Sequence, residues 1–521
     1  MFGQNVNEPI LPHRPRGEIH QIFICVDSGA HGDTDARLMR TLSIVPVALL
    51  VGAAAQGTSK DYPPGWNGEA TTPPMGWRSW NAFGANIKHD TFVQAISALT
   101  TKMWSVDGKM VSFADVGYSR VGIDEGWENC SGTAPNDGLR QHDELGFPMV
   151  NIDKFPDLKG LVDYGHRAGV QMGWYLNGCA CGERKERALN YQGDVQRLHE
   201  YGFDAVKLDG CGAATNMTRY AELMAATGRS YEIENCHWGH CGEDAWFHNP
   251  DGSSCPTASW CPFNHFRTSG DINAGLTSWL ANLQTTTKFQ DAEAPLSVPG
   301  CWAYPDMMEV GRIKGGDVNW SRAHFGAWCV VSAPLILGLD VTDNATLATI
   351  AHFLTNPEAI AVNQQWAGHP GRKVVDFGDV SVPAALGRGT HATEHTAAAE
   401  GLRVDHAHGD GLHFGPRTSS TPAAPLDASG FTMQVWIKPQ PKGKLAVYVV
   451  NPTPHGTDVA VDFATLGLGA EVTGAGVRDL WARKDLGDVK GRLLTASVAS
   501  MDSVFLLLTP QPTALPLVEA A

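Results

Sequence analysis

The chain has 521 residues, of which 43% are hydrophobic and 18% are charged, so disorder over the whole chain is excluded. The 39 Lys and Arg residues against 55 Asp and Glu residues give a net charge of −16. An acidic surface repels a phosphate backbone, so nucleic acid is disfavoured as a partner. The length suffices for two or three domains.

Residues 1–57 are predicted to be an N-terminal extension that holds a signal peptide. Its apolar core, 42–55, follows Arg40 and ends in small residues, as signal peptides do. Because signal peptides begin a chain, we expect Met39 to be the true start, with residues 1–38 as an upstream extension. The alternative is a buried apolar helix. A signal peptide directs the protein to secretion, a lysosome or a vacuole. The sequence contains no run of about 18 apolar residues, so no membrane span is predicted.

Eight short apolar runs, each ending near a polar residue, alternate with helix-like stretches such as Phe155–Ala168. Successive runs end 27 to 52 residues apart, and one βα unit needs roughly 30 residues. Eight units predict an α/β fold, a (β/α)₈ TIM barrel over residues 70–365, with an open doubly wound sheet as the alternative. The runs cover 75–80, 119–124, 170–176, 204–209, 230–236, 265–271, 301–306 and 333–340.

The composition changes after the barrel. Residues 366–430 are rich in Ala, Gly and His and lack periodicity, so we expect an irregular linker or insertion there. Its His-rich part, 394–408, shows no fixed ligand spacing and is interpreted as a loop, not a metal site. In residues 431–510 short alternating runs return between Gly and Pro turns, which predicts a C-terminal antiparallel β-sandwich domain.

Two aspartates at run ends are the candidate catalytic residues: Asp209 ends the fourth run and Asp271 ends the sixth. Hydrolysis of a glycoside needs one ionised carboxylate to attack the anomeric carbon and one carboxylic acid to protonate the leaving oxygen. Lys207 points to the same side of its strand as Asp209 and would keep it ionised. Arg267, near Asp271, would bind a hydroxyl or balance charge. The alternative is that both aspartates are helix N-caps.

Nine motifs occur in a fixed order along the chain: PPMGWRSWNAFGANI, GYSRVGIDEGWENC, GWYLNGC, KLDGCG, FRTSGDI, PGCWAYPDMMEVG, IAVNQQ, KPQPKGKLAVYVVNP and VRDLWARKDLG. The first seven span roughly residues 70–370 and the last two lie in the C-terminal domain. Together they resemble the α-galactosidase (melibiase) family, glycoside hydrolase family 27. The resemblance implies a retaining exo-glycosidase that removes terminal α-D-galactosyl residues from a carbohydrate substrate, with no metal and no organic cofactor.

The resemblance also implies roles for individual residues. Asp209 matches the nucleophile and Asp271 the acid/base of a double displacement. Asp124 and Glu125 fall where the family holds the C4 and C6 hydroxyls of the sugar. The residues implied to contact the sugar or the nucleophile are Trp80, Asp124, Glu125, Tyr175, Lys207, Cys236, Trp238, Arg267 and Asp306.

Two cysteine positions differ from the family pattern. Where the family usually has one disulfide, this chain has Ala85 and Gly126, which implies a replaced bridge beside an intact site. A second family bridge joins the loop after the third run to the cysteine behind the nucleophile. For this chain the resemblance implies a bridge between Cys181 and Cys211, with Cys179 as the open alternative.

Substrate choice depends on Glu125, because the family usually has Asp at this position. One more methylene carries the carboxylate about 1.5 Å further and could crowd the hydroxymethyl group of galactose. β-L-Arabinopyranose lacks that group, so a β-L-arabinopyranosidase is the alternative to the favoured α-galactosidase. An alternative of another class is a catalytically inactive glycan-binding barrel, although both carboxylates are present. A homodimer is compatible with the sequence, which does not decide the oligomeric state.

Overall fold

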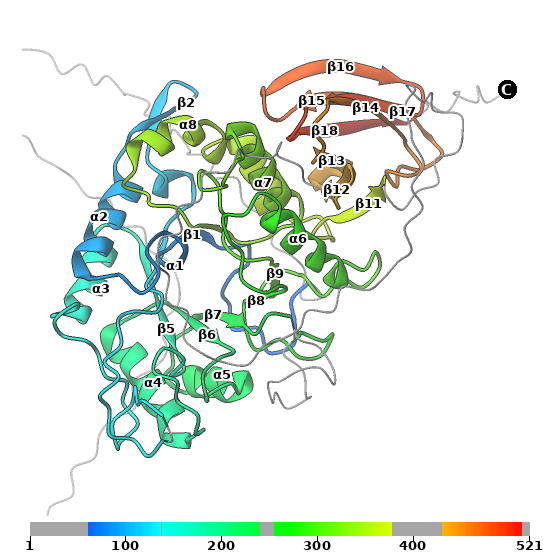
Figure 1. Cartoon of the computed structure of the whole chain (residues 1–521). Coiled ribbons are helices and arrows are strands. Elements are labelled where there is room, and N and C mark those ends of the chain that lie inside the picture. The colour runs from blue at the N-terminus through cyan, green and yellow to red at the C-terminus, as the bar shows by residue number, and fades with distance from the viewer. Residues whose placement is uncertain (1–60, 137, 240–254, 378–429, 513–521) are drawn as a thin grey trace, which may run out of the picture. The chain divides into compact units, whose positions relative to one another are not determined.

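The computed structural model describes residues 61–136, 138–239, 255–377 and 430–512 (Figure 1). The predicted N-terminal extension with its signal peptide, including Met39, and the His-rich stretch at 394–408 lie outside these residues. Among the described helices, none is both long and apolar enough to cross a membrane.

Eight parallel strands form one sheet in the order β10-β1-β4-β5-β6-β7-β8-β9. They are β1 (Met75–Arg78), β4 (Arg120–Gly122), β5 (Gln171–Leu176), β6 (Ala205–Asp209), β7 (Glu232–Cys236), β8 (His265–Arg267), β9 (Trp302–Tyr304) and β10 (Leu335–Leu337). Each strand lies inside one predicted run. A parallel bridge between Met308, just after β9, and Leu337 joins the two ends of the sheet. The prediction of a (β/α)₈ barrel is therefore confirmed.

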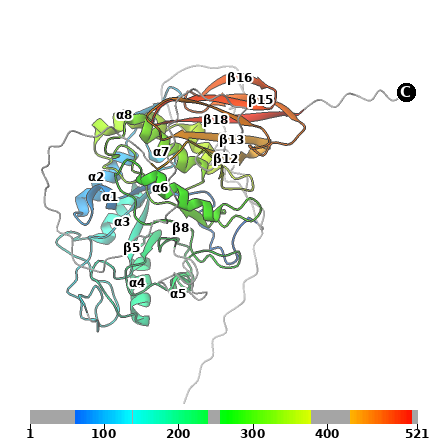
Figure 2. The same cartoon turned by 45° about the vertical axis from the view of Figure 1, so that its right-hand side comes forward.

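Helices follow the strands and surround the sheet (Figures 1 and 2). They are α1 (Trp80–Phe83), α2 (His89–Thr100), α3 (Leu158–Arg167), α4 (Ala188–Tyr201), α5 (Met217–Ala226), α6 (Ser278–Thr285), α7 (Val318–Val330), α8 (Asn344–Leu354) and α9 (Pro357–Gln364). The helix predicted from Phe155 begins at Leu158, because the Asp157 side chain accepts the Gly160 N–H and caps it. A hairpin of β2 (Trp104–Val106) and β3 (Lys109–Val111) was not predicted and accounts for the long first spacing.

The main apolar core lies between the sheet and the helices. In β6, Val206 and Leu208 are buried in this core. Because side chains alternate along a strand, the intervening Lys207 and Asp209 face the barrel axis. The same alternation directs polar side chains of neighbouring strands to the axis, and these form the site described below.

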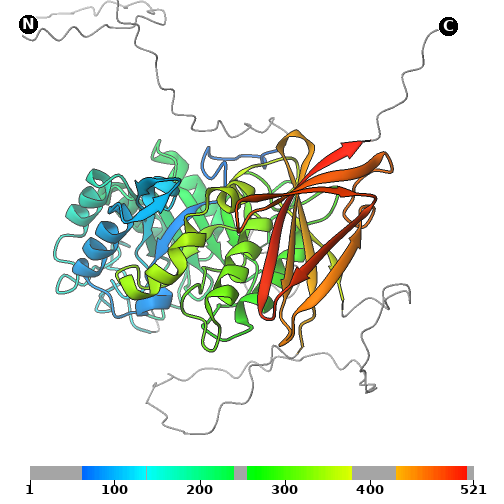
Figure 3. The same ribbon diagram turned by 90° about the horizontal axis from the view of Figure 1, so that it is seen from above.

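The C-terminal domain consists of two antiparallel sheets (Figure 3). The larger has the order β11-β12-β13-β18-β15-β16, and the smaller pairs β14 with β17. Their apolar faces share one buried cluster that includes Val447, Val459 and Leu508, as expected for a sandwich. The strands are β11 (Arg372–Asp376), β12 (Gln434–Gln440), β13 (Lys444–Asn451), β14 (Thr457–Asp462), β15 (Val472–Asp479), β16 (Lys484–Lys490), β17 (Leu493–Val498) and β18 (Asp502–Pro512).

Residues 366–430 were expected to be irregular, but one segment of this range is a strand. Residues 372–376 form β11, which pairs with β12 at the edge of the larger sheet. Three of its five residues are charged, so its sequence lacks an alternating pattern, and backbone pairing with β12 makes it a strand. Residues 378–429 lie outside the described part of the chain.

Candidate active site

The candidate site lies at the carboxyl ends of the barrel strands. Tyr175 lies in β5, Asp209 ends β6, Cys236 ends β7 and Arg267 ends β8, while Asp124 follows β4. All parallel strands of a barrel end at one face, so residues far apart in sequence converge there.

Asp209 is oriented by two neutral donors. The Tyr175 hydroxyl donates to Oδ2 at 3.0 Å, and the Gly210 N–H donates to Oδ1 at 2.7 Å. Burial raises the pKa of Asp209, the charges of Asp124 and Asp271 add to this, and the Lys207 ammonium opposes it. The Lys207 ammonium bonds to Asp124 at 2.9 Å, so it acts on Asp209 only through space. Lys207 was expected to keep Asp209 ionised. It does lower the pKa of Asp209, but burial raises that pKa by more.

Asp271 lies in the loop after β8, and 58% of its side chain is exposed. The buried Arg267 guanidinium lies 3.0 Å from Asp271 Oδ1 and 2.9 Å from Asp306 Oδ2. The Ile272 N–H also donates to Asp306 Oδ2, at 2.8 Å. Arg267 and Asp306 thus hold the loop on both sides of Asp271, whose exposed carboxyl group is accessible to a leaving group and to water.

Asp124 and Glu125 connect to the same cluster. Asp124 Oδ2 accepts from Lys207, and its Oδ1 accepts the Glu125 N–H at 2.9 Å. Glu125 Oε2 lies 3.4 Å from the Tyr175 hydroxyl. Burial raises the pKa of Glu125, and the charges of Asp124 and Asp209 add to the rise. The structure thus brings five of the residues expected from the sequence into one cluster of hydrogen bonds.

The remaining expected residues end or follow barrel strands: Cys236 ends β7, Trp238 follows it, and Trp80 follows β1. Cys236 is buried, and the Arg267 guanidinium lies 3.4 Å from its sulfur. Trp80 begins α1 and is partly buried against the apolar core. Trp238 is 38% exposed and adopts a positive φ of 58°. Both indole rings keep accessible surface, which stacking on a sugar ring requires.

The prediction that Cys181 pairs with Cys211 is wrong. Cys211 pairs with Cys179, and Cys181 pairs with Cys130, each with a Cα–Cα distance of 5.2 Å. Cys130, in the loop after β4, lies within bridging distance of Cys181 and forms a disulfide with it. Cys179 is therefore the cysteine that pairs with Cys211.

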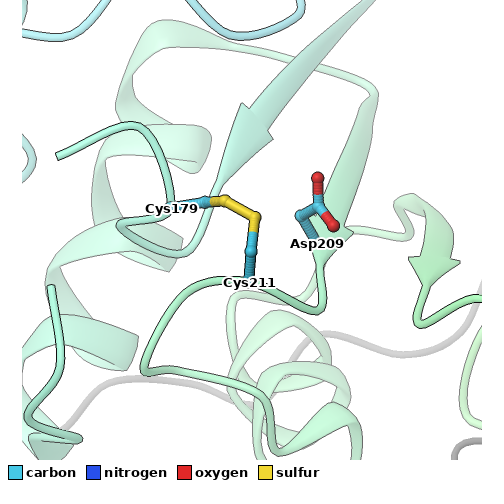
Figure 4. A group of neighbouring side chains, drawn as sticks. All are labelled: Cys179, Asp209 and Cys211. Carbon is cyan, nitrogen blue, oxygen red and sulfur yellow. A yellow bond between two sulfur atoms is a disulfide. The ribbon is translucent and has the colours of Figure 1, made fainter. Parts of the chain in front are cut away.

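Figure 4 shows the Cys179–Cys211 disulfide beside Asp209. The two sulfurs and the nearest Asp209 oxygen lie within 4.8 Å of one another, close enough to share a metal ion. Metal ions bind cysteine as a thiolate, and sulfurs bonded to each other are not thiolates. The disulfide therefore acts here as a tie between the loop after β5 and the residues behind Asp209.

Ala85 and Gly126, which stand where the family usually has a disulfide, are in contact. A Cβ atom on Gly126 would lie 2.5 Å from the Ala85 carbonyl oxygen, and Gly126 has a φ of +118° that disfavours any other residue. The Lys154 ammonium donates to the Ala85 carbonyl at 3.0 Å and to the Gly126 carbonyl at 2.9 Å. Two hydrogen bonds from Lys154 thus join the segments that the family usually joins with a disulfide.

A buried network between the loops after β4 and β5 was not predicted. The His142 ring lies 2.7 Å from Glu183 and 2.9 Å from Asp194, and the Tyr220 hydroxyl donates to Asp194 at 2.7 Å. Burial alone would lower the pKa of His142, but Asp194 and Glu183 raise it to about 9. The network joins the loops after β4 and β5 to α4 and α5. No sequence motif marks it, because its members pair across 41 and 52 residues.

This network predicts a loss of stability at alkaline pH. The pKa of His142 rises from 6.5 to about 9 on folding, so its stabilisation is complete below pH 6.5 and is lost as pH rises through about 9. His142→Gln leaves two buried carboxylates without a cation, so we expect a loss of about 3 to 5 kcal/mol in the free energy of unfolding at pH 6. Urea unfolding between pH 5 and 9 measures both effects.

The matched control is His455→Gln, since His455 is exposed on the C-terminal domain. The control should unfold like the wild type at every pH. A His142→Gln variant with the wild-type pH dependence of unfolding would contradict the assigned role of the network.

The fold and the site define a class of protein. A (β/α)₈ barrel whose strand ends present one half-buried, oriented carboxylate and one exposed carboxyl group has the arrangement of a glycoside hydrolase. The family profile described as alpha galactosidase A matches residues 72–365, and that of the alpha galactosidase C-terminal beta sandwich domain matches residues 430–508. The chain therefore belongs to the α-galactosidase A family.

Individual relatives agree with this membership. Alpha-galactosidase 3 of Arabidopsis thaliana is 28% identical over 453 residues, which cover 85% of this chain and 83% of the relative. The structure of α-galactosidase I from Mortierella vinacea has a TM-score of 0.61 at 21% identity, covering 86% of this chain and 100% of that one. A β-L-arabinopyranosidase from Geobacillus stearothermophilus has a TM-score of 0.59 at 19% identity, with coverage of 86% and 98%. The two solved structures share the fold and act on different sugars, so the fold does not select the sugar.

Proposed function

We propose that the chain is a retaining exo-α-galactosidase that hydrolyses terminal non-reducing α-D-galactosyl residues. The observation that carries the proposal is the pair of carboxyl groups in different environments: Asp209 is half-buried and accepts from neutral donors, whereas Asp271 is exposed and pairs with Arg267. Asp209 attacks the anomeric carbon while Asp271 protonates the leaving oxygen. Asp271 then deprotonates a water molecule that releases the sugar with its configuration retained.

The neighbours of Asp209 suit this role. Burial raises the pKa of Tyr175 well above its usual value, so its hydroxyl stays protonated and keeps donating to Asp209. Because the pKa of Asp209 is itself raised, activity falls once acid protonates the nucleophile. We therefore expect kcat/KM on nitrophenyl α-galactoside to fall on the acid side of its pH profile as Asp209 gains a proton.

In the same proposal, the rest of the cluster binds the sugar. Asp124, Glu125 and Lys207 present carboxylates and an ammonium group to the hydroxyls, and Trp80 covers the apolar face of the ring. Asp306 acts through Arg267, which it holds at 2.9 Å. The active enzyme is favoured over an inactive glycan-binding barrel because both carboxyl groups are present and each is held in place.

Replacing the nucleophile tests the mechanism. In Asp209→Asn the amide cannot form the covalent intermediate, so kcat on nitrophenyl α-galactoside should fall on the order of 10⁴-fold. The melting temperature should stay close to that of the wild type, since the amide oxygen still accepts from the Gly210 N–H and the amide NH₂ can donate to the Tyr175 hydroxyl oxygen. The control Asp163→Asn removes an exposed carboxylate on α3 that pairs with Lys159, and should keep full activity. Wild-type turnover by Asp209→Asn would refute the assignment.

Galactose is favoured over β-L-arabinopyranose as the substrate. Glu125 has Tyr175 as a partner inside the site, and a relative whose match covers 85% of this chain is named an α-galactosidase. Glu125→Asp shortens the side chain by one methylene and makes room at the hydroxymethyl group. We expect it to raise the ratio of kcat/KM on the α-galactoside to that on the arabinopyranoside about tenfold. An unchanged ratio, equal to that of the exposed control Glu222→Asp, would show that Glu125 does not crowd this group.

Export through a signal peptide that starts at Met39 is part of the proposal. It is supported by the disulfides Cys130–Cys181, Cys179–Cys211 and Cys261–Cys301 within the described residues, because disulfides form in oxidising compartments. N-terminal sequencing of the native protein should find a mature end after the apolar core at 42–55. A mature end before residue 50 would contradict the proposal. The homodimer stays a prediction that light scattering on the purified protein tests.

A further inference from the structure

The interior of the barrel directly beneath the site is charged. Arg78 of β1, Asp124 after β4, Lys207 of β6, Glu234 of β7 and His265 of β8 are all buried there. Barrel interiors are usually filled by layers of branched apolar side chains. A buried charge is costly unless it is paired, so the contacts among these residues decide what they do.

Arg78 joins two carboxylates. Its guanidinium lies 3.0 Å from Glu234 Oε2 and 3.5 Å from Asp124 Oδ2. Asp124 Oδ2 also accepts from the Lys207 ammonium at 2.9 Å. His265 lies 3.4 Å from the Glu234 oxygen that faces Arg78. One oxygen of Asp124 is therefore held by two cations that come from β1 and β6.

The backbone leaves room for this contact. Gly122 of β4 pairs with Arg78 across the sheet, and a Cβ atom on Gly122 would lie 3.0 Å from the guanidinium carbon. Asp124 lies two residues beyond Gly122, so the guanidinium reaches it across the face of the glycine. A side chain at 122 would therefore require the Arg78 guanidinium to shift from this position.

Glu234 stays ionised in this environment. Burial alone would raise the pKa of Glu234, but Arg78 and His265 hold it far below its usual range. A permanent carboxylate keeps the planar guanidinium of Arg78 in one orientation. Lys207 has a single rotatable ammonium group and cannot by itself fix the direction of a carboxylate.

We propose that Arg78, anchored by Glu234, is a positioning residue that fixes the direction of the Asp124 carboxylate and so determines how tightly the site holds the hydroxyls of the sugar. The inference rests on the proposed function, in which Asp124 and Glu125 bind hydroxyls of the sugar, at the positions where the family holds the C4 and C6 hydroxyls. Arg78 acts on sugar binding and leaves attack at the anomeric carbon to Asp209. Its loss therefore raises KM much more than it lowers kcat.

The chain offers a matched control for a merely structural role. Arg120 of β4 forms an ion pair of the same kind with Glu232 of β7, at 2.5 Å. Both residues lie at the start of their strands, so this pair is one layer further from the site than Arg78 and Glu234. Arg120→Met should lower stability and leave KM unchanged.

The experiment measures KM and kcat on nitrophenyl α-galactoside and on its 4-deoxy and 6-deoxy analogues. With Arg78→Met we expect KM on the full galactoside to rise about tenfold, the value of one charge-assisted hydrogen bond, and kcat to stay within about threefold. The rise in KM should disappear on at least one deoxy analogue, because that analogue lacks the hydroxyl that Asp124 binds. Arg78→Lys should restore part of the binding.

A second variant tests the same inference if Arg78→Met does not fold. Glu234→Gln keeps the shape of the side chain and removes the charge that anchors Arg78, so it should raise KM in the same direction. An unchanged KM in both variants would overturn the inference. Equal rises in KM on all three substrates, or the same rise in Arg120→Met, would also overturn it. A wild type inactive on every α-galactoside would instead refute the proposed function.

Discussion

Charge pairing across strands is the constraint on which the catalytic end of this barrel depends. Arg267 holds Asp271 and Asp306, and Lys207 holds Asp124. Each pair joins side chains from different strands or from a strand and the loop beyond it, so the register of the sheet sets the positions of the carboxylates. Within the described residues Asp209 forms no ion pair and takes hydrogen bonds from neutral donors. The carboxylate assigned to attack is thus left with its charge uncompensated by direct contact.

The loops that carry the site are held from outside the barrel as well. The Cys179–Cys211 disulfide ties the loop after β5 to the residues behind the nucleophile. The Cys130–Cys181 disulfide and the buried His142 network join that loop to the one after β4. Loops are the most mobile parts of a fold, and positioning of catalytic groups requires them to be rigid. These covalent and ionic links supply that rigidity on the side of the site where Asp124 and Glu125 lie.

Much of this architecture could be predicted from the sequence, and the reason lies in periodicity. Every barrel strand falls inside a short apolar run, because an apolar outer face and a polar end mark each βα unit. Asp209 and Asp271 stood out because each ends such a run. Strand β11 was missed, because its backbone pairs with β12 while its side chains lack alternation.

The pairing partners inside the site could not be predicted. Arg78 is 156 residues from Glu234, and their contact depends on the register of strands that do not adjoin in sequence. The sequence does show an arginine, Arg78, at an inward position of an apolar strand. It does not show which acidic residue pairs with that arginine. The disulfide partner of Cys211 likewise depends on the geometry of the loop after β5. Cys179 and Cys181 are only two residues apart, so the sequence does not distinguish between them.

In the proposed mechanism Asp209 forms the covalent bond to the sugar, while Asp271 donates a proton to the leaving oxygen and later accepts one from water. Labelling with a fluorinated galactosyl fluoride, which slows release of the covalent intermediate, followed by protease digestion and mass spectrometry tests it most directly. We expect one fluorogalactosyl group per chain, on the peptide and side chain of Asp209. A label on another carboxylate, or turnover with inverted configuration and no covalent species, would contradict it.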